Sequence, residues 1–503
     1  MHAKYCGLIL ISTLALWTAS FAQTSHPEEP AMQIFAGGYP TAEASQRLKD
    51  ELLFQNAVQT YLWALPALNM YGMKEGSEKV FGKGNDVLPV WKQRLNAKTL
   101  ITTPNSDVIY AMGYLDLAED GPLVIEVPPG LEGILDDFWQ RPICSEGEID
   151  GRVWCGDVGL PGPDRGKGGK YLLLAPDYKG SPPSGYYTMR SRTYGVFVFW
   201  RGFFKDPKDL APPVQNIERT RIYPLGKEDS AKPMQFPDAS NVPANMLFPT
   251  DGAAFDMLAR FIDHEYVDPA DMWMRGIAAS LGIVKGKPFA PDTGLRATLD
   301  RAARVAFGMS RAVDYGPGAA FTKFYQDRQW LNAFPGGSPW FTAPTFDQTL
   351  LRTAFFSFAY STSPGMAVSM VDVGAKYPFA FTDAEGNFLS GAKAYRLHLP
   401  SDIPAKLFWS VTVYDALTAS GLDNGQAFPS INTMDKPATN TDGSTDIYFG
   451  PASPGDGKNW LRTVAGKGFF VILRLYGPTE PFSTRPGALA ISKRSGDTKL
   501  RRP

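Results

Sequence analysis

Short apolar runs cut by glycine and proline constrain the fold of this chain more than any other feature. "GPLVIEVPP" (121–129) and "GKYLLLAP" (169–176) are too short for a typical helix and are bounded by turn-forming residues. In "TPNSDVIYAMGYLDL" (103–117), Tyr110, Met112 and Tyr114 recur at every second position, which is the period of a strand. Several short strands with turn signals between them predict a β-sandwich or a barrel.

The same pattern returns near the C-terminus. "AYRLHLP" (394–400), "LFWSVTVYD" (407–415), "DIYFGP" (446–451) and "FFVILRLYG" (469–477) are strand-like runs separated by turns. In the N-terminal half, "YYTMRSRTYGVFVFWRGF" (186–203) predicts either a strand pair or one long bent strand. The chain therefore has two β-rich regions.

Helical periodicity appears at the start and in the middle. Residues 41–65 predict a helix that Thr41 caps and that Pro66 ends or kinks. Three further helices are predicted within 269–283, 295–309 and 345–360. The predicted class is β-rich α+β, with a helix and β-sandwich over 41–250, a helical connecting region over 251–370, a C-terminal β-sandwich over 371–490 and a tail over 491–503.

Composition limits the classes of partner. The 503 residues carry a formal net charge of −1, which gives no basic face for nucleic acid. Beyond the N-terminus, no apolar run is long enough to span a bilayer. The expected partner is a small-molecule or oligomeric ligand.

The N-terminus has the pattern of a signal peptide. "MHAK" supplies a positive charge, "GLILISTLALW" an apolar stretch, and Ser20-Phe21-Ala22 a small-residue cleavage site. The alternative is an uncleaved anchor. Cleavage would remove residues 1–22, leave a disordered tail over 23–40 and place the protein in the periplasm or outside the cell.

Two cysteines, Cys144 and Cys155, would remain after cleavage. In an oxidising compartment they are expected to form a disulfide, worth roughly 3 kcal/mol for so short a loop. The alternative, a metal pair, lacks a nearby histidine, and we predict no metal site.

Six stretches, in two sets, carry a family resemblance. "PNSDVIYAMGYLDL" followed by "GPLVIEVPP" resembles the bacterial domain of unknown function 1254, although Val108 stands where threonine is usual. "LFWSVTVYD", "DGSTDIYFGP", "NWLRT" and "FFVILRLYGP" together resemble the domain of unknown function 1214. The resemblance covers about residues 45 to 485 and implies jelly-roll-like β-sandwiches with helices between them, often in a homo-oligomer. It implies no reaction.

The polar residues at the head of the first long strand have two interpretations. Asn105 and Asp107 are typical of a capped turn, with Tyr110 in the core behind it. Alternatively, Asp107 is an acid/base group or ligand anchor that Asn105 orients, and Tyr110 supplies a ring and a hydroxyl.

Arginines and hydroxyl groups on other strands extend this hypothesis. Arg192 and Arg201 are candidates for binding an anionic group, although salt bridges with nearby aspartates are the alternative. Tyr414 lies on a strand face with other hydroxyl groups, and Asn432 follows in a loop. Both are predicted to contact the ligand.

Three classes of function remain open. The first is an enzyme of hydrolase or lyase type without a cofactor, because the sequence has neither a nucleophile elbow nor a phosphate-binding glycine loop. The second is a ligand-binding or stress-related module, and the third an oligomeric structural protein. A sealed cavity with a desolvated carboxylate would favour the enzyme, an aromatic groove without one would favour binding, and a solid core would favour structure.

Overall fold

The computed structural model describes residues 38–315, 321–324, 329–368, 374–479 and 491–493. The chain forms two units, Met1–Gln55 and Asn56–Pro503, and the sheets described below lie in the second. The expected signal peptide (1–22) and its cleavage site lie outside the described residues, as do most of both predicted tails. Among the described residues, every helix is too short or too polar to cross a membrane.

The first helix is longer than the sequence indicates. α2 (Ala42–Phe81) begins after Thr41, whose hydroxyl accepts a hydrogen bond from the Ala44 amide (3.1 Å), as a helix cap does. The helix continues through Pro66, where the sequence predicts an end or a kink. Residues 64–73, on both sides of the proline, are all buried, so tertiary packing outweighs the hydrogen bond that proline removes.

Two sheets in the N-terminal half face each other across one core. The first has the order β2-β9-β4-β6 and the second the order β10-β3-β7-β8-β5. A separate parallel pair joins β1 (Thr99–Leu100) to β11 (Ala244–Asn245). The strands of the two larger sheets are β2 (Ile109–Asp116), β9 (Gly195–Gly202), β4 (Glu132–Asp137), β6 (Asp157–Val158), β10 (Arg221–Pro224), β3 (Leu123–Val127), β7 (Gly169–Leu174), β8 (Tyr187–Arg190) and β5 (Cys144–Ser145).

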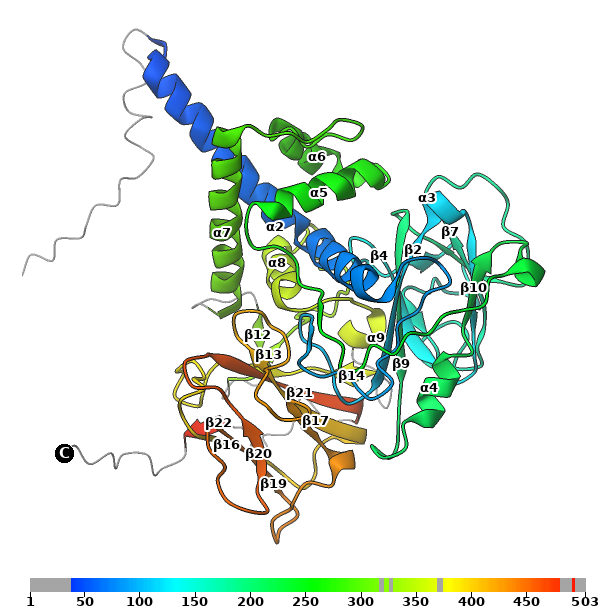
Figure 1. Cartoon of the computed structure of the whole chain (residues 1–503), viewed down its shortest axis with the longest axis vertical. Coiled ribbons are helices and arrows are strands. Elements are labelled where there is room, and N and C mark those ends of the chain that lie inside the picture. The colour runs from blue at the N-terminus through cyan, green and yellow to red at the C-terminus, as the bar shows by residue number, and fades with distance from the viewer. Residues whose placement is uncertain (1–37, 316–320, 325–328, 369–373, 480–490, 494–503) are drawn as a thin grey trace, which may run out of the picture. The chain divides into compact units, whose positions relative to one another are not determined.

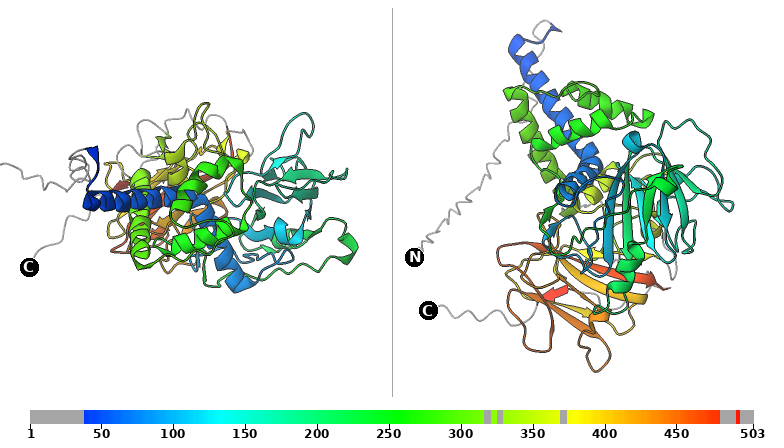
Figure 2. Two further views of the ribbon diagram at one scale, coloured as in Figure 1. Left: turned by 90° about the horizontal axis from the view of Figure 1, so that it is seen from above. Right: turned by 45° about the vertical axis from the view of Figure 1, so that its right-hand side comes forward.

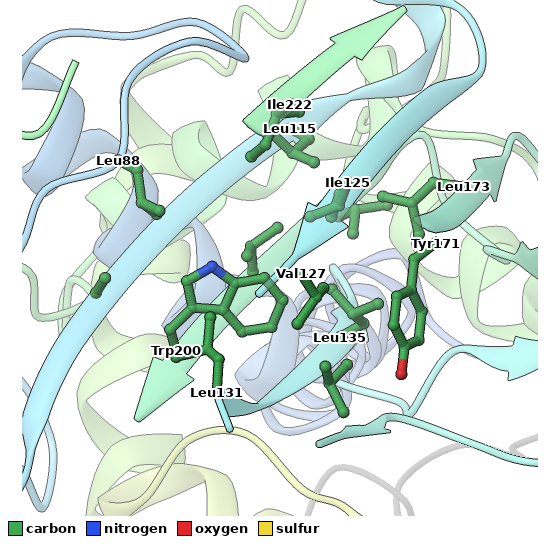
Figure 3. Packing of buried hydrophobic residues seen from close by; sticks show 14 of the residues in the cluster. Leu88, Leu115, Ile125, Val127, Leu131, Leu135, Tyr171, Leu173, Trp200 and Ile222 are labelled. Carbon is green, nitrogen blue, oxygen red and sulfur yellow. The ribbon is translucent and has the colours of Figure 1, made fainter. Parts of the chain in front are cut away.

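Trp200 fills the centre of this core. Figure 3 shows its indole among Val127, Leu131 and Leu135, which come from both sides of the sandwich. Gly133 pairs with Trp200 across β4 and β9, and a Cβ at Gly133 would lie 2.1 Å from the indole. The ring therefore needs a glycine opposite it, and any larger side chain there would displace the ring from the core.

The C-terminal half repeats the arrangement with different strand orders. The larger sheet runs β12-β13-β15-β21-β17-β18, and β14 also pairs with β21; the smaller one runs β20-β19-β16-β22. β17 and β21 lie side by side (Figure 1). The strands are β12 (Thr322–Lys323), β13 (Leu331–Asn332), β14 (Ala375–Lys376), β15 (Phe379–Ala380), β16 (Tyr395–Leu399), β17 (Ala405–Asp415), β18 (Ser430–Asn432), β19 (Thr445–Gly450), β20 (Asn459–Arg462), β21 (Phe469–Pro478) and β22 (Ile491–Lys493).

Apolar side chains from both C-terminal sheets form a second core, so this half is also a sandwich. Figure 2 shows the strands of the two halves, cyan to green and yellow to red, as separate groups. These strand orders do not identify either sandwich as a jelly roll. The predicted β-rich α+β class is confirmed.

Most helices lie between the sandwiches in sequence, as predicted. The three predicted segments correspond to α6, α7 and α8. α8 is buried along most of its length and ends beside the cavity described next. The remaining elements are α3 (Leu117–Asp120), α4 (Ala211–Ile217), α5 (Ala253–His264), α6 (Met272–Ser280), α7 (Thr293–Tyr315), α8 (Thr349–Phe358), α9 (Pro364–Ala367) and the 3-10 turns η2 (Glu228–Ser230), η3 (Pro269–Asp271) and η4 (Thr433–Asp435).

Candidate functional site

The face of the β2-β9-β4 sheet that points away from its core is polar and aromatic. Tyr110 pairs with Arg201 across β2 and β9, and Arg201 pairs with Glu132 across β9 and β4. Directly paired residues project to the same side of a sheet, so these three side chains form one row. The alternation visible in the sequence thus separates an apolar core face from this second face.

A similar face is present on the larger C-terminal sheet. Ser410 pairs with Arg474 across β17 and β21, while their neighbours Trp409 and Leu475 belong to the core on the other side. Arg474 is only 4% exposed. A charged residue therefore stands in the middle of an otherwise apolar strand.

Side chains from the two faces enclose a cavity of about 70 Å³. A buried water needs about 10–15 Å³, so the cavity has room for a few waters or a small organic group. Most of its wall is aromatic. The lining residues are Thr103, Tyr110, Phe199, Arg201, Ala333, Phe334, Phe355, Phe358, Ala359, Tyr360, Met366, Tyr377, Phe379, Ile472 and Arg474.

Arg201 is the least satisfied polar group in this wall. Its Nε is buried without a hydrogen-bond partner, and no carboxylate among the described residues forms an ion pair with it. Its guanidinium lies over the ring of Phe199, 5.3 Å from the centroid. Glu132 faces it from the next strand without an ion pair, and burial raises the pKa of that carboxyl group. A buried guanidinium nitrogen without a hydrogen-bond partner destabilises the fold unless a ligand supplies an acceptor for it.

Arg474 is bound by neutral partners. Its Nη1 donates to the hydroxyl of Thr412 (3.2 Å), and its Nη2 donates to the backbone carbonyl oxygens of Thr103 (3.1 Å) and Pro104 (3.2 Å). Thr103 has a φ of 36°, which is rare for a β-branched residue. These bonds hold the strained turn in place but leave the positive charge of Arg474 without a carboxylate.

The tyrosines of the wall act as neutral hydrogen-bonding groups. Burial raises the pKa of Tyr110 above its ordinary value, although Arg201 and Arg474 act in the opposite direction. Burial likewise raises the pKa of Tyr360 well above its ordinary value. Both phenols therefore keep their protons at neutral pH and can donate a hydrogen bond to an anion.

Asp107 lies at the centre of a separate, fully bonded cluster. It is completely buried, and its carboxylate accepts from Arg94 Nη2 (3.0 Å), Ser430 Oγ (2.8 Å) and Asn432 Nδ2 (2.7 Å). Arg94 also donates through Nε to the Ser106 carbonyl oxygen. We call Arg94, Asp107, Ser430 and Asn432 the Asp107 cluster. It joins the N-terminal sandwich to the C-terminal one, and none of its members lines the cavity.

Two other predicted site residues also join the sandwiches. Asn105 accepts from the amide of Asp107 (2.8 Å), as expected for a turn, and its Nδ2 donates to the hydroxyl of Tyr476. The hydroxyl of Tyr414 donates to the carbonyl oxygen of Pro104 (2.6 Å). Of the predicted residues, only Tyr110 and Arg201 line the cavity together.

The structure does not bring Arg192 to this cavity. Its guanidinium binds Asp268, with Nε and Nη2 at 2.8 and 2.7 Å from Oδ2, and it is half exposed. It lines another groove, together with Cys144 and Tyr266. The turn between β8 and β9 separates it from Arg201, so the two arginines do not share a site.

The predicted disulfide is present. Cys144 and Cys155 are bonded, with their Cα atoms 3.9 Å apart. Within the described part of the chain, no group of three or more histidine, cysteine, aspartate or glutamate side chains is arranged to hold a metal ion.

Two buried carboxyl groups lie on the same sheet face as the cavity wall. Asp157 pairs with Ile134, next to Phe199 on β9, and it accepts from the amide of Gly365 (2.7 Å). Burial raises the pKa of Asp157 to about 6. Burial also raises the pKa of Asp136, which accepts from the hydroxyl of Ser361 (2.7 Å). Neither lines the cavity.

Sequence reasoning missed several of the important residues. Arg474 had a usable signal, because a charge inside the apolar run "FFVILRLYG" needs a reason to be buried. Tyr360 follows the helix α8 and Tyr377 follows the short strand β14, and nothing local marks them as cavity residues. Arg94 lies in a polar loop with no recognisable motif.

Family models match two parts of the chain. Residues 86–224 match the family described as "Protein of unknown function (DUF1254)", and residues 374–480 match "Protein of unknown function (DUF1214)". The order of the two agrees with the resemblance seen in the sequence. The cavity and the Asp107 cluster both draw residues from each matched region.

Two solved structures are similar to this chain, and the first of them supports the fold alone. A crystal structure of the VPA0106 protein from Vibrio parahaemolyticus is 18% identical, with a TM-score of 0.50, covering 88% of this chain and all of that one. A putative uncharacterized protein from Burkholderia cenocepacia is 14% identical, with a TM-score of 0.37, covering 93% of each chain. A search of curated proteins gave no match.

Proposed function

We propose that this chain, which carries a DUF1254 region followed by a DUF1214 region, is an exported protein that binds a small carboxylate with an apolar body. The observation that carries the proposal is Arg201, a partly buried arginine whose Nε is buried without a hydrogen-bond partner beside an aromatic cavity.

The chemistry of the wall favours a carboxylate. A guanidinium presents parallel N–H groups that match the two oxygens of a carboxylate. Arg474 adds a second positive charge that protein carboxylates leave unneutralised, and the phenol of Tyr110 adds a donor. The phenylalanine rings offer an apolar surface for the rest of the ligand, as in typical small-molecule sites.

Binding is better supported than catalysis. A hydrolase or lyase without a cofactor needs a general acid or base within hydrogen-bond reach of the substrate. Among the described residues that line the cavity, the ionisable groups are arginines and tyrosines, and the tyrosines that burial affects keep their protons. A cofactor-independent hydrolase or lyase remains the second candidate, with Glu132 and Asp157 as candidate carboxyl groups on that face. The presence of a cavity, in place of a solid core, argues against a purely structural role.

Binding can be tested with matched acids and amides. Isothermal titration of the folded protein should detect hexanoate and benzoate but bind hexanamide and benzamide at least 10-fold more weakly. Arg201→Met should weaken carboxylate binding roughly 10- to 100-fold, the effect of losing a charge-assisted hydrogen-bonded pair. Arg304→Met, at an exposed arginine on α7, is the matched control and should leave binding unchanged. Equal affinity for acids and amides, or no binding of either, would refute the proposal.

Export is tested separately. We expect the protein isolated from its cell of origin to begin near Gln23, because a signal peptidase would cleave after Ala22. N-terminal sequencing decides this, and a mature chain that still begins at Met1 would show that the segment is not removed.

A further inference from the structure

A second chamber adjoins the cavity. This outer chamber has a volume of about 460 Å³, and Ala333, Phe334, Met366 and Tyr377 line both chambers. Arg201 and Arg474 line only the inner one. The inner chamber, with about 70 Å³, holds a carboxylate and little more, so a longer ligand needs further space, and the outer chamber is next to it.

A lysine stands in the outer chamber. Lys376 on β14 lines the outer chamber but not the inner one. Its Nζ donates to the carbonyl oxygen of Val368 (3.0 Å), and no carboxylate among the described residues forms an ion pair with it. Burial lowers the pKa of Lys376 to about 8, so the amine is still mostly protonated at neutral pH. The ammonium group has two donors left for a ligand.

The two chambers together form a space whose inner part is lined by Arg201 and Arg474 and whose outer part is lined by Lys376, and no carboxylate among the described residues forms an ion pair with any of the three. Four residues line both chambers. Three of these four are Phe334, Met366 and Tyr377, which offer an apolar or aromatic surface. Such a space is complementary to a molecule with an apolar middle and an anionic group at either end.

We propose that the two chambers connect past their shared residues and that the ligand of this site is an elongated dicarboxylate, with one carboxylate bound by Arg201 and Arg474 and the other by Lys376. This inference rests on the proposed function and makes it more specific. A monocarboxylate would fill the inner end alone and would leave Lys376 without an anionic partner.

Matched pairs of linear acids test the inference. Titration calorimetry of the full-length protein would compare hexanoate with adipate, octanoate with suberate, and decanoate with sebacate. Each pair has the same chain length and differs in the second carboxylate. We expect at least one dicarboxylate to bind about 10-fold more tightly than its monocarboxylate, because a second charge-assisted contact forms only when the length fits.

Variants separate the two ends of the ligand. Lys376→Met should abolish the advantage of the dicarboxylate and leave monocarboxylate affinity unchanged, whereas Lys376→Arg should retain it. Lys393→Met, at an exposed lysine, is the matched control. Arg201→Met should weaken both acids of every pair. Thermal unfolding of each variant confirms that it is folded before titration.

The outcomes distinguish this inference from the proposed function. If monocarboxylates bind but no dicarboxylate has an advantage, or if Lys376→Met keeps that advantage, the dicarboxylate inference is wrong and the carboxylate site stands. If neither kind of acid binds to the folded protein, both fail.

Discussion

Arg94 is buried and Arg201 is partly buried, and the two arginines differ in how completely protein groups bind them. Arg94 contacts Asp107 and Asp435 at 3.0 and 3.6 Å, donates to a backbone oxygen, and lies 4.1 Å from the ring centroid of Phe428. Arg201 has a ring beside it and an Nε without a partner. An arginine whose hydrogen-bond donors are all bound by protein groups stabilises the fold. An arginine with unbound donors is a candidate for binding a ligand.

Replacing Arg94 should lower the free energy of unfolding more than any other substitution that we propose. Arg94→Met leaves Asp107 buried without its cation, and breaking a buried pair from one side typically costs 3–5 kcal/mol. We expect urea unfolding to show a loss of about that size, if the variant folds at all. A loss below about 1 kcal/mol would show that the Asp107 cluster does not stabilise the junction between the sandwiches.

Asp157, unlike Asp107, is a buried carboxyl group that forms no ion pair among the described residues. Its pKa is raised from 3.8 to about 6, so the folded protein binds this proton more tightly than the unfolded chain does. The contribution of this group to stability is therefore complete below pH 3.8 and is lost as the pH rises through 6. The shift corresponds to about 3 kcal/mol.

Asp157→Asn removes this dependence on pH. The asparagine oxygen can still accept a hydrogen bond from the amide of Gly365. The free energy of unfolding of the variant, relative to that of the wild type, should therefore rise by about 3 kcal/mol from pH 4 to pH 7.5. Urea titrations at pH 4, 5.5 and 7.5 measure the difference in the free energy of unfolding. A difference that stays constant over this range would contradict the prediction.

Asp107→Asn separates the two interpretations of the strand entrance. The substitution keeps the size of the side chain but removes the charge that Arg94 binds, so we expect a loss of about 2 kcal/mol in urea unfolding. Affinity for hexanoate should not change, because Asp107 does not line the cavity. Lost affinity with unchanged stability would instead place Asp107 in the ligand site, as its sequence context first suggested.

The sequence predicted the features that depend mainly on nearby residues. The period of two in 109–116 gave a strand with Tyr110 on one face, and the small number of cysteines in an expected oxidising compartment gave the disulfide. The partners of Asp107 could not be read in this way, because Ser430 and Asn432 lie 323 and 325 positions away. The cavity likewise depends on how two sandwiches pack, which brings Arg474 on β21 to the same space as Arg201 on β9. Arg192 and Arg201 looked alike in the sequence, but the turn before β9 places them at different surfaces.

Arg201→Met should have the smallest effect on stability and the sharpest contrast with Arg94→Met. The substitution removes a partly buried charge that has no protein partner, which favours folding, and it loses a contact with the ring of Phe199, worth roughly 0.5–1 kcal/mol. We expect the free energy of unfolding without ligand to stay within about 1 kcal/mol of the wild type. A gain in stability would also follow from the removal of a charge that has no protein partner. Urea unfolding of the two methionine variants side by side provides the measurement. If Arg201→Met lost as much stability as Arg94→Met, Arg201 would be a structural group, and the unpaired guanidinium could no longer be taken as the mark of a binding site.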